Sequence, residues 1–163
     1  MPDMNATIGR NMNGAPSKIE DQIQWLVDRE SIADLITNYA TCVDGRDWHG
    51  WAHCFADEGV FEMEGVSVPR SDMADWLKTQ LRFYAGTQHI MTNLRIEISH
   101  DNATTRHYLH SVHLPTLKEP RHHADIGGWY DSMLRRTDRG WRFTRVRLTF
   151  VWEDGVEFVH GTS

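Results

Sequence analysis

Two residues of this chain, Asp44 and His89, are of the types that transfer protons near neutral pH. Asp44 lies in the run Tyr39-Ala-Thr-Cys-Val-Asp-Gly-Arg-Asp-Trp48, at the end of a helical pattern, and His89 lies in the later run Thr-Gln-His-Ile-Met-Thr-Asn. A histidine held by a carboxylate can take a proton from a carbon next to a carbonyl, while the carboxylate fixes the tautomer and stabilises the imidazolium. Meeting in one pocket, the two would make this chain an enzyme.

The same residues also have a purely structural interpretation. Asp44 lies about 100° around the helix from the centre of its apolar stripe, so it can equally be a surface acid at a helix end. His89 stands alone in a strand, where a hydrogen-bonded structural histidine is common. Tyr39 lies on the apolar face, as a core tyrosine would. Periodicity alone leaves both interpretations open.

The histidines His107, His110 and His113 raise the question of a metal site. In a strand, residues 107 and 113 share one face and residue 110 points to the other, and 107 and 113 lie about 20 Å apart at ~3.3 Å per residue. One ion cannot bridge that distance. We therefore predict no metal site, and no cofactor either, because the His/Asp pair can perform its chemistry alone.

Length and composition limit the function further. The 163 residues fit one domain, and the 40% hydrophobic content, with seven Trp, supplies a core. The formal charge of −6 and the scattered basic residues predict no nucleic-acid binding. No apolar run is long enough for a membrane helix, and the first residues do not resemble a signal peptide. With only Cys42 and Cys54 available, we expect reduced thiols in a cytoplasmic protein.

The sequence predicts, in chain order, the elements that must position these residues. Residues 1–17 are polar and small, which predicts a flexible leader before a single domain over 18–155 and a tail over 156–163. The series Ile32, Leu35, Ile36, Tyr39 and Val43 has helical spacing, and Gly45 is a plausible stop. Asp47 can cap a short helix over 48–55. A further helix is expected from Ser71 to Tyr84.

The remaining segments are extended. Two short strands are expected at 60–63 and 66–68, followed by four long ones at 87–99, 103–114, 122–136 and 141–152, with a hairpin signal at 138–140. Helices first and a meander afterwards predict an α+β fold, in which a curved, mostly antiparallel sheet wraps around N-terminal helices as a cone-shaped barrel. The mouth of such a cone is where a ligand would bind.

Several short motifs in a fixed order resemble the SnoaL-like branch of the nuclear-transport-factor-2-like superfamily over residues 25–155. They are Asp28-Arg-Glu-Ser-Ile-Ala-Asp-Leu-Ile-Thr-Asn-Tyr39, Val43-Asp44-Gly-Arg-Asp47-Trp48, Phe55-Ala-Asp57, His89-Ile-Met-Thr-Asn93, and Gly128-Trp129-Tyr130 with Arg136-Thr-Asp-Arg-Gly-Trp141. The resemblance implies the cone fold and, in dehydratase members such as scytalone dehydratase and bile-acid 7α-dehydratase, an Asp/His pair. Asp44 and His89 match that pair. Tyr39 and His113 match further catalytic positions of such members.

The expected reaction is a dehydratase-like elimination without a cofactor. Isomerisation, cyclisation and retro-aldol cleavage would use the same base, and a non-catalytic binding module would keep the same cone. Met63, Ala124 and Ile126 are apolar where scytalone dehydratase has polar groups, so we expect a small hydrophobic cyclic or aromatic substrate. Strand parity predicts the lining as Trp51, Met63, Met91, Leu109, Ile126, Val146, Leu148 and Phe150.

The outer face of such an open sheet predicts association. Relatives cover this face by pairing with another copy, and a homodimer or homotrimer would satisfy the pattern. The charged outer positions Arg145 and Arg147 are compatible with this arrangement.

Overall fold

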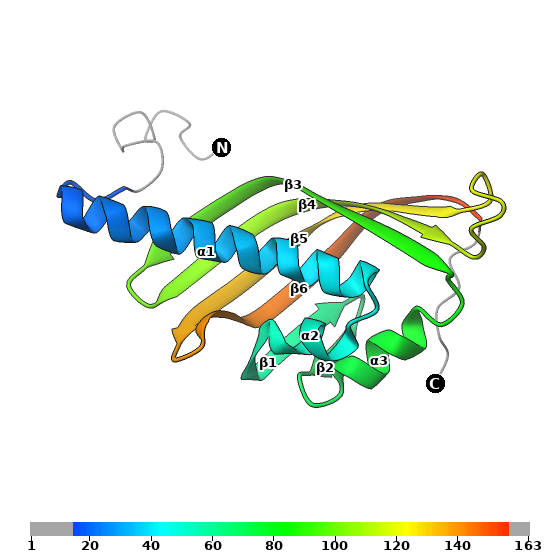
Figure 1. Ribbon diagram of the computed structural model, residues 1–163, viewed down its shortest axis with the longest axis horizontal. Helices are drawn as coiled ribbons and strands as arrows, with labels where there is room; N and C mark the ends of the chain where they lie inside the picture. The colour runs from blue at the N-terminus through cyan, green and yellow to red at the C-terminus, as the bar shows by residue number, and fades with distance from the viewer. Residues whose placement is uncertain (1–14, 157–163) are drawn as a thin grey trace.

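The computed structural model describes residues 15–156, so most of the expected leader and tail lies outside the described residues. Within this range the elements follow one another from an N-terminal helical part to a long meander (Figure 1). They are α1 (Ile19–Asp44), α2 (Trp48–His53), β1 (Phe55–Met63), β2 (Val66–Pro69), α3 (Met73–Gln80), β3 (Gly86–Ser99), β4 (Asn102–Leu114), β5 (Ala124–Thr137) and β6 (Gly140–Gly155).

The strands form one sheet in the order β2-β1-β6-β5-β4-β3. All neighbours are antiparallel except β1 and β6, which run parallel. The sheet curves around α1, which crosses its concave side, while α2 and α3 lie near β1 and β2 (Figure 1). The predicted α+β fold with a curved, mostly antiparallel sheet is confirmed. The sheet stays open, with β2 and β3 at its two edges.

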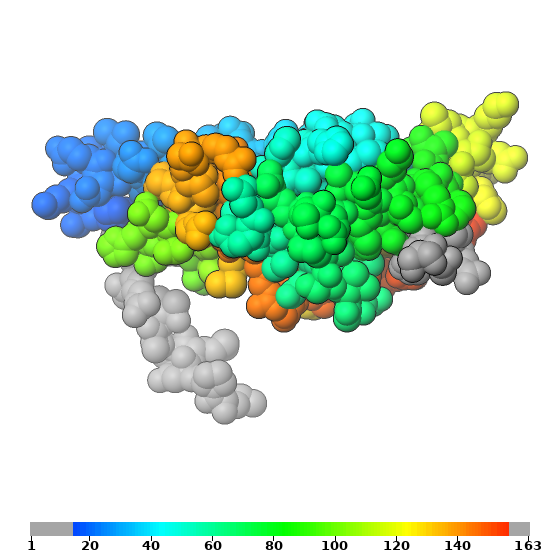
Figure 2. Space-filling view, turned by 90° about the horizontal axis from the view of Figure 1, so that it is seen from below, coloured from blue at the N-terminus to red at the C-terminus, as the bar shows by residue number. Residues whose placement is uncertain are grey.

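Helix α1 buries one stripe along its second half. Ile32 is fully buried and Ile36, Tyr39 and Val43 are 3–4% exposed, as the helical spacing predicts. Its first turns project past the sheet (Figures 1 and 2), and there the apolar side chains Ile19, Ile23, Leu26 and Val27 remain more than half exposed. The apolar spacing therefore continues beyond the part of the helix that has a partner.

The turn after α1 determines where the chain goes next. The helix ends at Asp44, one residue before the predicted stop, and the Gly45 N–H donates to the Thr41 carbonyl at 2.8 Å. The left-handed residue is Arg46, with φ of 62°, and not Gly45. Asp47 then caps α2 through a 2.8 Å hydrogen bond that its side chain accepts from the Gly50 N–H.

Helix α3 is shorter than the sequence predicts. The expected helix through Tyr84 ends at Gln80, because Leu81 leaves the helical conformation and only single turns lead to β3. Leu81 and Tyr84 are nevertheless buried, at 6% and 5% exposure. Their hydrophobic spacing reflects burial in a turn and not a continuing helix.

Strand β6 departs from simple alternation. Its register with β5 shifts between Met133 and Leu134, which pair with Arg145 and Phe143, so Thr144 is an extra residue on β6. Phe143 and Val146 are consequently both buried, at 1% and 2% exposure, although strict alternation assigns them to opposite faces. No helix within residues 15–156 is long and apolar enough to cross a membrane.

Candidate functional site

Asp44 and His89 come together because the end of α1 lies beside the start of β3. Asp44 is the last residue of α1, and His89 lies near the start of β3, which runs along α1. Thr87 and His89 are two residues apart on β3, so both side chains point to the same side of the strand. That side faces the end of α1, where Asp44 emerges.

The Asp44 carboxylate accepts three hydrogen bonds from β3. Its Oδ1 lies 2.7 Å from His89 Nδ1 and 2.9 Å from Thr87 Oγ1, and its Oδ2 lies 2.9 Å from the His89 backbone nitrogen. A carboxylate only accepts, so the proton of the short bond sits on Nδ1. Nε2 on the other edge of the imidazole is then left as an acceptor, as a general base requires.

The electrostatics of this pair favour an ionised Asp44. Burial raises the pKa of the carboxyl, but hydrogen bonds from His89 and Thr87 and the charge interaction with His89 outweigh burial, so the net pKa lies below its ordinary value. The His89 side chain is 8% exposed and that of Asp44 27% exposed. The imidazole is thus shielded from water, while the carboxylate keeps some solvent contact.

His89 lines a cavity of about 80 Å³ inside the cone. Apolar and aromatic side chains form most of its wall, and none of the described residues that line it is Lys, Arg, Asp or Glu. The lining residues are Tyr39, Val43, Trp51, Phe61, Met63, Trp76, Leu77, Gln80, Leu81, His89, Leu109, Ser111, His113, Ile126, Tyr130, Leu148 and Phe150. In such an apolar surrounding, the interaction of the His89 imidazole with the Asp44 charge is stronger than it would be in water.

Tyr39 is on this wall and also part of an aromatic cluster. Its ring lies edge-on to Trp51 and Tyr130 at 5.6 and 5.7 Å between centroids, and the residue is 4% exposed. Burial, and secondarily the neighbouring Tyr130, raises the pKa of the Tyr39 hydroxyl well above its ordinary value. Tyr39 therefore stays protonated, and its hydroxyl, which hydrogen-bonds with that of Tyr130, acts through hydrogen bonding and not as a phenolate.

His113 lines the same cavity, next to His89. The two imidazole rings are 5.5 Å apart at an interplanar angle of 80°, and the Tyr84 ring packs edge-on against His113 at 5.1 Å between centroids. Burial, with smaller effects of His89 and Arg46, lowers the pKa of His113 to about 3. His113 is then neutral at pH 7, so it can act through hydrogen bonding but not as a charged acid.

Six of the eight predicted lining residues lie on the cavity wall: Trp51, Met63, Leu109, Ile126, Leu148 and Phe150. Met91 and Val146 do not line this cavity. Val146 instead lies beside Tyr39, Tyr130 and Phe143, two residues before Leu148 on the inward side of β6. Met91 packs against the hydrophobic core on β3.

Several residues of the site were not predicted. Tyr130 and Ser111 face inwards on β5 and β4, and the parity of these strands was sufficient to find them. Thr87 lies two residues before His89, so the same rule applies to it. Gln80 and Trp76 come from α3, whose placement over the cavity has no sequence signal. Contacts of this kind depend on tertiary packing.

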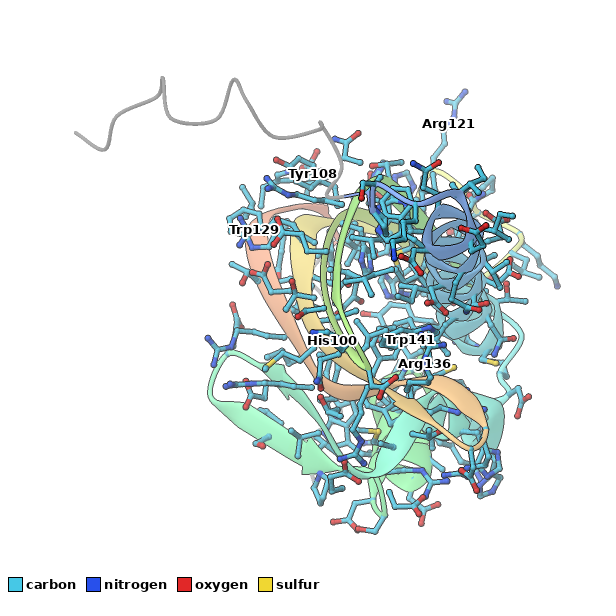
Figure 3. The ribbon with its side chains drawn as sticks, turned by 90° about the vertical axis from the view of Figure 1, so that its left-hand side faces the viewer. His100, Tyr108, Arg121, Trp129, Arg136 and Trp141 are labelled. Atoms are coloured by element: carbon cyan, nitrogen blue, oxygen red, sulfur yellow. The ribbon has the colours of Figure 1, made fainter. Side chains whose placement is uncertain are left out.

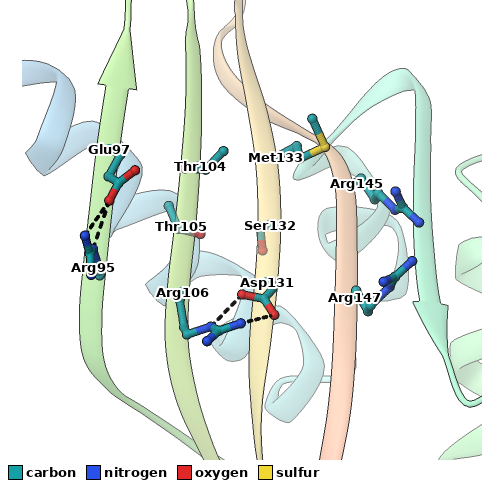
Figure 4. Close-up of a pocket in the computed structure, with 10 residues that line it drawn as sticks. All are labelled: Arg95, Glu97, Thr104, Thr105, Arg106, Asp131, Ser132, Met133, Arg145 and Arg147. Atoms are coloured by element: carbon teal, nitrogen blue, oxygen red, sulfur yellow. Dashed lines mark hydrogen bonds and ion pairs between the residues drawn. The ribbon is translucent and has the colours of Figure 1, made fainter. Parts of the chain in front are cut away.

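Another hollow on the described surface does not contain the Asp44–His89 pair. A shallow groove of about 410 Å³ lies on the face of the sheet turned away from α1, where Arg106 is paired with Asp131 at 2.6 and 2.7 Å and Arg95 with Glu97 (Figure 4). The two other arginines of the groove, Arg145 and Arg147, both donate to Glu62 Oε2. Among residues 15–156, no group of three or more His, Cys, Asp or Glu side chains is placed to hold a metal ion.

Solved structures with the same architecture include three informative cases. One is a variant of Rv3472, a protein of unknown function from Mycobacterium tuberculosis, with 25% identity and a TM-score of 0.71 over 79% of this chain and 75% of that chain. Another, from Novosphingobium aromaticivorans, is provisionally named a scytalone dehydratase, with 20% identity and a TM-score of 0.76 over 85% and 94%. The third is a hexachlorocyclohexane dehydrochlorinase, LinA type 2, with 23% identity and a TM-score of 0.69 over 86% and 97%.

The sequence itself gives the family. A search of curated proteins found no significant match. In contrast, the profile of the SnoaL-like domain matches residues 24–147, which run from within α1 to the middle of β6. This range contains Tyr39, Asp44, His89 and His113, and it covers most of the 163 residues. The chain belongs to the SnoaL-like domain family.

Proposed function

We propose that this protein is a cofactor-independent lyase of the dehydratase type, acting on a hydrophobic cyclic or aromatic small molecule with His89 as the general base. The observation that carries the proposal is the 2.7 Å contact between Asp44 Oδ1 and His89 Nδ1 at the wall of an apolar cavity. The family and fold neighbours named for dehydration and dehydrochlorination support an enzyme that converts small molecules.

In the proposed reaction, His89 Nε2 takes a proton from a carbon next to the substrate carbonyl. The electron pair of that C–H bond forms the new carbon–carbon double bond as the C–O bond to the leaving hydroxyl breaks. The imidazolium then returns the proton to the leaving oxygen, which departs as water, so atoms and charge balance. Asp44 stabilises the transient imidazolium. The Tyr39 hydroxyl would polarise the carbonyl by donating a hydrogen bond, and neutral His113 would orient the leaving group.

The cavity also limits the substrate that we propose. Its lining offers hydroxyls, an amide and imidazoles, but among the described lining residues there is no charged partner for a carboxylate or a phosphate. Burying an unpaired charge there would be costly, so the substrate should be uncharged.

The free, buried Cys42 and Cys54 fit the reducing cytoplasmic setting that the sequence predicts.

Two alternatives use the same site. An isomerase, cyclase or retro-aldol lyase would need the same base and the same carbonyl polarisation. A binding module would use the apolar cavity for ligand capture alone. The dyad geometry favours the enzyme, because a core of this kind does not need an ionised acid beside a histidine for stability.

Assays with hydroxylated cyclic ketones would test the proposal. Asp44→Asn and His89→Gln should each lower the rate by about 10² to 10⁴ while the protein stays folded. Matched controls are Asp34→Asn, on the exposed side of α1, and His110→Gln, on the outer side of β4, which should keep wild-type activity. Folded dyad variants with full turnover would contradict the proposal. Ligand affinity without turnover in the wild type would instead favour the binding module.

A further inference from the structure

The Asp44 carboxylate is held by a chain of donors that begins outside the cavity. The Arg46 Nη2 donates to the Tyr84 carbonyl at 3.0 Å, and Arg46 Nη1 lies 3.4 Å from Thr87 Oγ1. Thr87 Oγ1 in turn donates to Asp44 Oδ1 at 2.9 Å. We propose that Arg46 and Thr87 are positioning residues for the Asp44–His89 pair, an inference that rests on the proposed function.

The direction of this chain follows from the chemistry of its members. A guanidinium has only donors, so the Thr87 oxygen must be the acceptor in its contact with Arg46. The single hydroxyl hydrogen of Thr87 is then free to point at Asp44 Oδ1. Without Arg46 the hydroxyl could rotate and use its hydrogen elsewhere. Arg46 thus fixes the orientation of the Thr87 hydroxyl, and this hydroxyl in turn holds the Asp44 carboxylate in place.

The backbone of Arg46 supports a specific role for its side chain. Its φ of 62° is in the left-handed region, which costs energy for any residue with a Cβ. A glycine would adopt this conformation freely. Arg46 here extends its guanidinium to Thr87 and Tyr84 and stacks it 5.5 Å from the centre of the Trp48 ring. These contacts offset the backbone cost and join the end of α1 to β3.

For catalysis, these contacts give the His89 imidazolium a hydrogen-bond acceptor, Asp44 Oδ1, in a fixed position. Asp44 Oδ1 receives both Thr87 Oγ1 and His89 Nδ1, and the bond from the His89 N–H to Oδ2 prevents the carboxylate from turning over. Removal of the Thr87 hydroxyl leaves Oδ1 with His89 alone and weakens this restraint. Neither Arg46 nor Thr87 lines the cavity, so their loss should reduce kcat and leave KM unchanged.

The first test needs no substrate. In Thr87→Val, whose side chain has the same shape, the carboxyl carbon of Asp44 observed by ¹³C NMR should titrate at a higher pH than in the wild type, because one of the hydrogen bonds that hold its pKa low is lost. Thr87→Ser restores the hydroxyl and should restore the titration. Thr92→Val, an exposed position on the same strand, is the matched control and should leave it unchanged.

The second test uses turnover of whichever ketone the wild type converts. Thr87→Val should lose roughly ten-fold to a hundred-fold in kcat at constant KM, the usual effect of losing a hydrogen bond to a charged group. Arg46→Met should shift the Asp44 titration in the same direction, while exposed Arg82→Met should not. If Thr87→Val titrates like Thr92→Val, the positioning role is wrong even if Asp44→Asn is inactive. An active Asp44→Asn protein would instead overturn the proposed function.

Discussion

Asp44 is an acid at the unfavourable end of a helix. The C-terminus of α1 carries partial negative charge from unpaired carbonyls, which disfavours a carboxylate there. The structure compensates with donors from Thr87 and from both the ring and the backbone of His89. A residue that serves only to end a helix would not need this arrangement. The unfavourable placement of the Asp44 carboxylate is therefore better explained by a role in proton transfer than by a role in stability.

Tyr39 allows packing to be separated from chemistry. Tyr39→Phe keeps the ring contacts with Trp51 and Tyr130 but removes the hydroxyl that would polarise the substrate carbonyl. We expect activity to fall at least about ten-fold, while the free energy of unfolding changes by only about 1 kcal/mol. Steady-state rates and urea unfolding of the same samples would show this. Unchanged turnover would make Tyr39 a packing residue. Tyr108→Phe, on the outer face, is the control.

His107 should make stability depend on pH. It is 4% exposed and stacks on Tyr130 at 5.1 Å, and burial lowers its pKa from 6.5 to about 4. Unfolded His107 takes up a proton below pH 6.5, whereas the folded residue does so only near pH 4. The lowered pKa therefore favours unfolding as the pH falls through this window.

Urea unfolding at pH 7, 6 and 5 should reveal this effect. Between pH 7 and 5 the wild type should lose about 2 kcal/mol more than His107→Gln, which has no titrating group at this position. His113 remains in both proteins and contributes the same dependence to each. The exposed His110→Gln should keep the wild-type slope. Equal slopes for His107→Gln and the wild type would show that His107 is solvated in the folded state.

At the residue scale, the sequence alone was enough for some placements. Helical spacing correctly put Tyr39 and Val43 on the buried face of α1. The contact between Asp44 and His89, 45 positions apart, cannot be read from local periodicity and was expected from the family resemblance. The link from Arg46 to Thr87 had no local signal at all, because it depends on a left-handed backbone and on the packing of α1 against β3.

At the element scale, α1 is anchored far from the site by an ion pair between buried Asp28 and partly exposed Arg136. Asp28 is 5% exposed and accepts from Arg136 Nη1 and Nη2 at 2.7 and 2.6 Å. Trp141 Nε1 adds a bond to Asp28 at 3.2 Å, and the Arg136 guanidinium lies 4.6 Å from the centre of the Trp141 ring (Figure 3). These contacts join the first half of α1 to the β5–β6 hairpin, and so hold the helix at the angle that delivers Asp44.

Breaking this anchor should destabilise the fold without removing the site. Asp28→Asn should cost about 1 to 3 kcal/mol in urea unfolding at pH 7, since a charged hydrogen-bond acceptor is lost. The bond from Arg136 keeps the pKa of Asp28 below its ordinary value of 3.8. The contribution is therefore full above that pH and is lost as the pH falls through the lower folded pKa. Asp34→Asn on the exposed side of α1 should change little, and an equal loss there would contradict the anchor.

Element boundaries were predictable where they depend on local chemistry. Gly45, the Asp47 cap and the hairpin at 138–140 gave the ends of α1, α2 and β5 within a few residues. The end of α3 was missed because buried Leu81 and Tyr84 continue a helical spacing in a segment of turns. The bulge at Thr144 was missed because one extra residue changes strand parity without changing composition.

At the scale of the whole molecule, the order of elements predicted the fold class but not which strands pair across the sheet. The parallel pairing of β1 with β6 places the first strand beside the last, and no local pattern predicts such a long-range contact. Its effect is to bring Met63 next to Leu148 on the cavity wall. The strand order therefore creates the cavity, whereas the apolar side chains along the strands give the cavity its hydrophobic character.

The outer face of the sheet carries an apolar patch formed by Ile90, Tyr108, Trp129 and Trp152. Tyr108 and Trp129 point away from α1 (Figure 3), and Tyr108 and Trp152 are 49% and 45% exposed. Trp152 covers Gly127, where a Cβ would collide with the indole ring. Aromatic side chains grouped on an open sheet are typical of a face that another protein surface covers.

We therefore expect a second or third copy of this chain to bury the patch. Light scattering at micromolar concentration should give the mass of two or three chains for the wild type. Tyr108→Glu combined with Trp152→Glu should give a monomer, because a buried, unpaired carboxylate opposes association. Leu117→Glu, at an exposed apolar residue between β4 and β5, should leave the mass unchanged. A wild type that remains monomeric would contradict this expectation, and an outer-face variant that stays assembled would place the interface elsewhere.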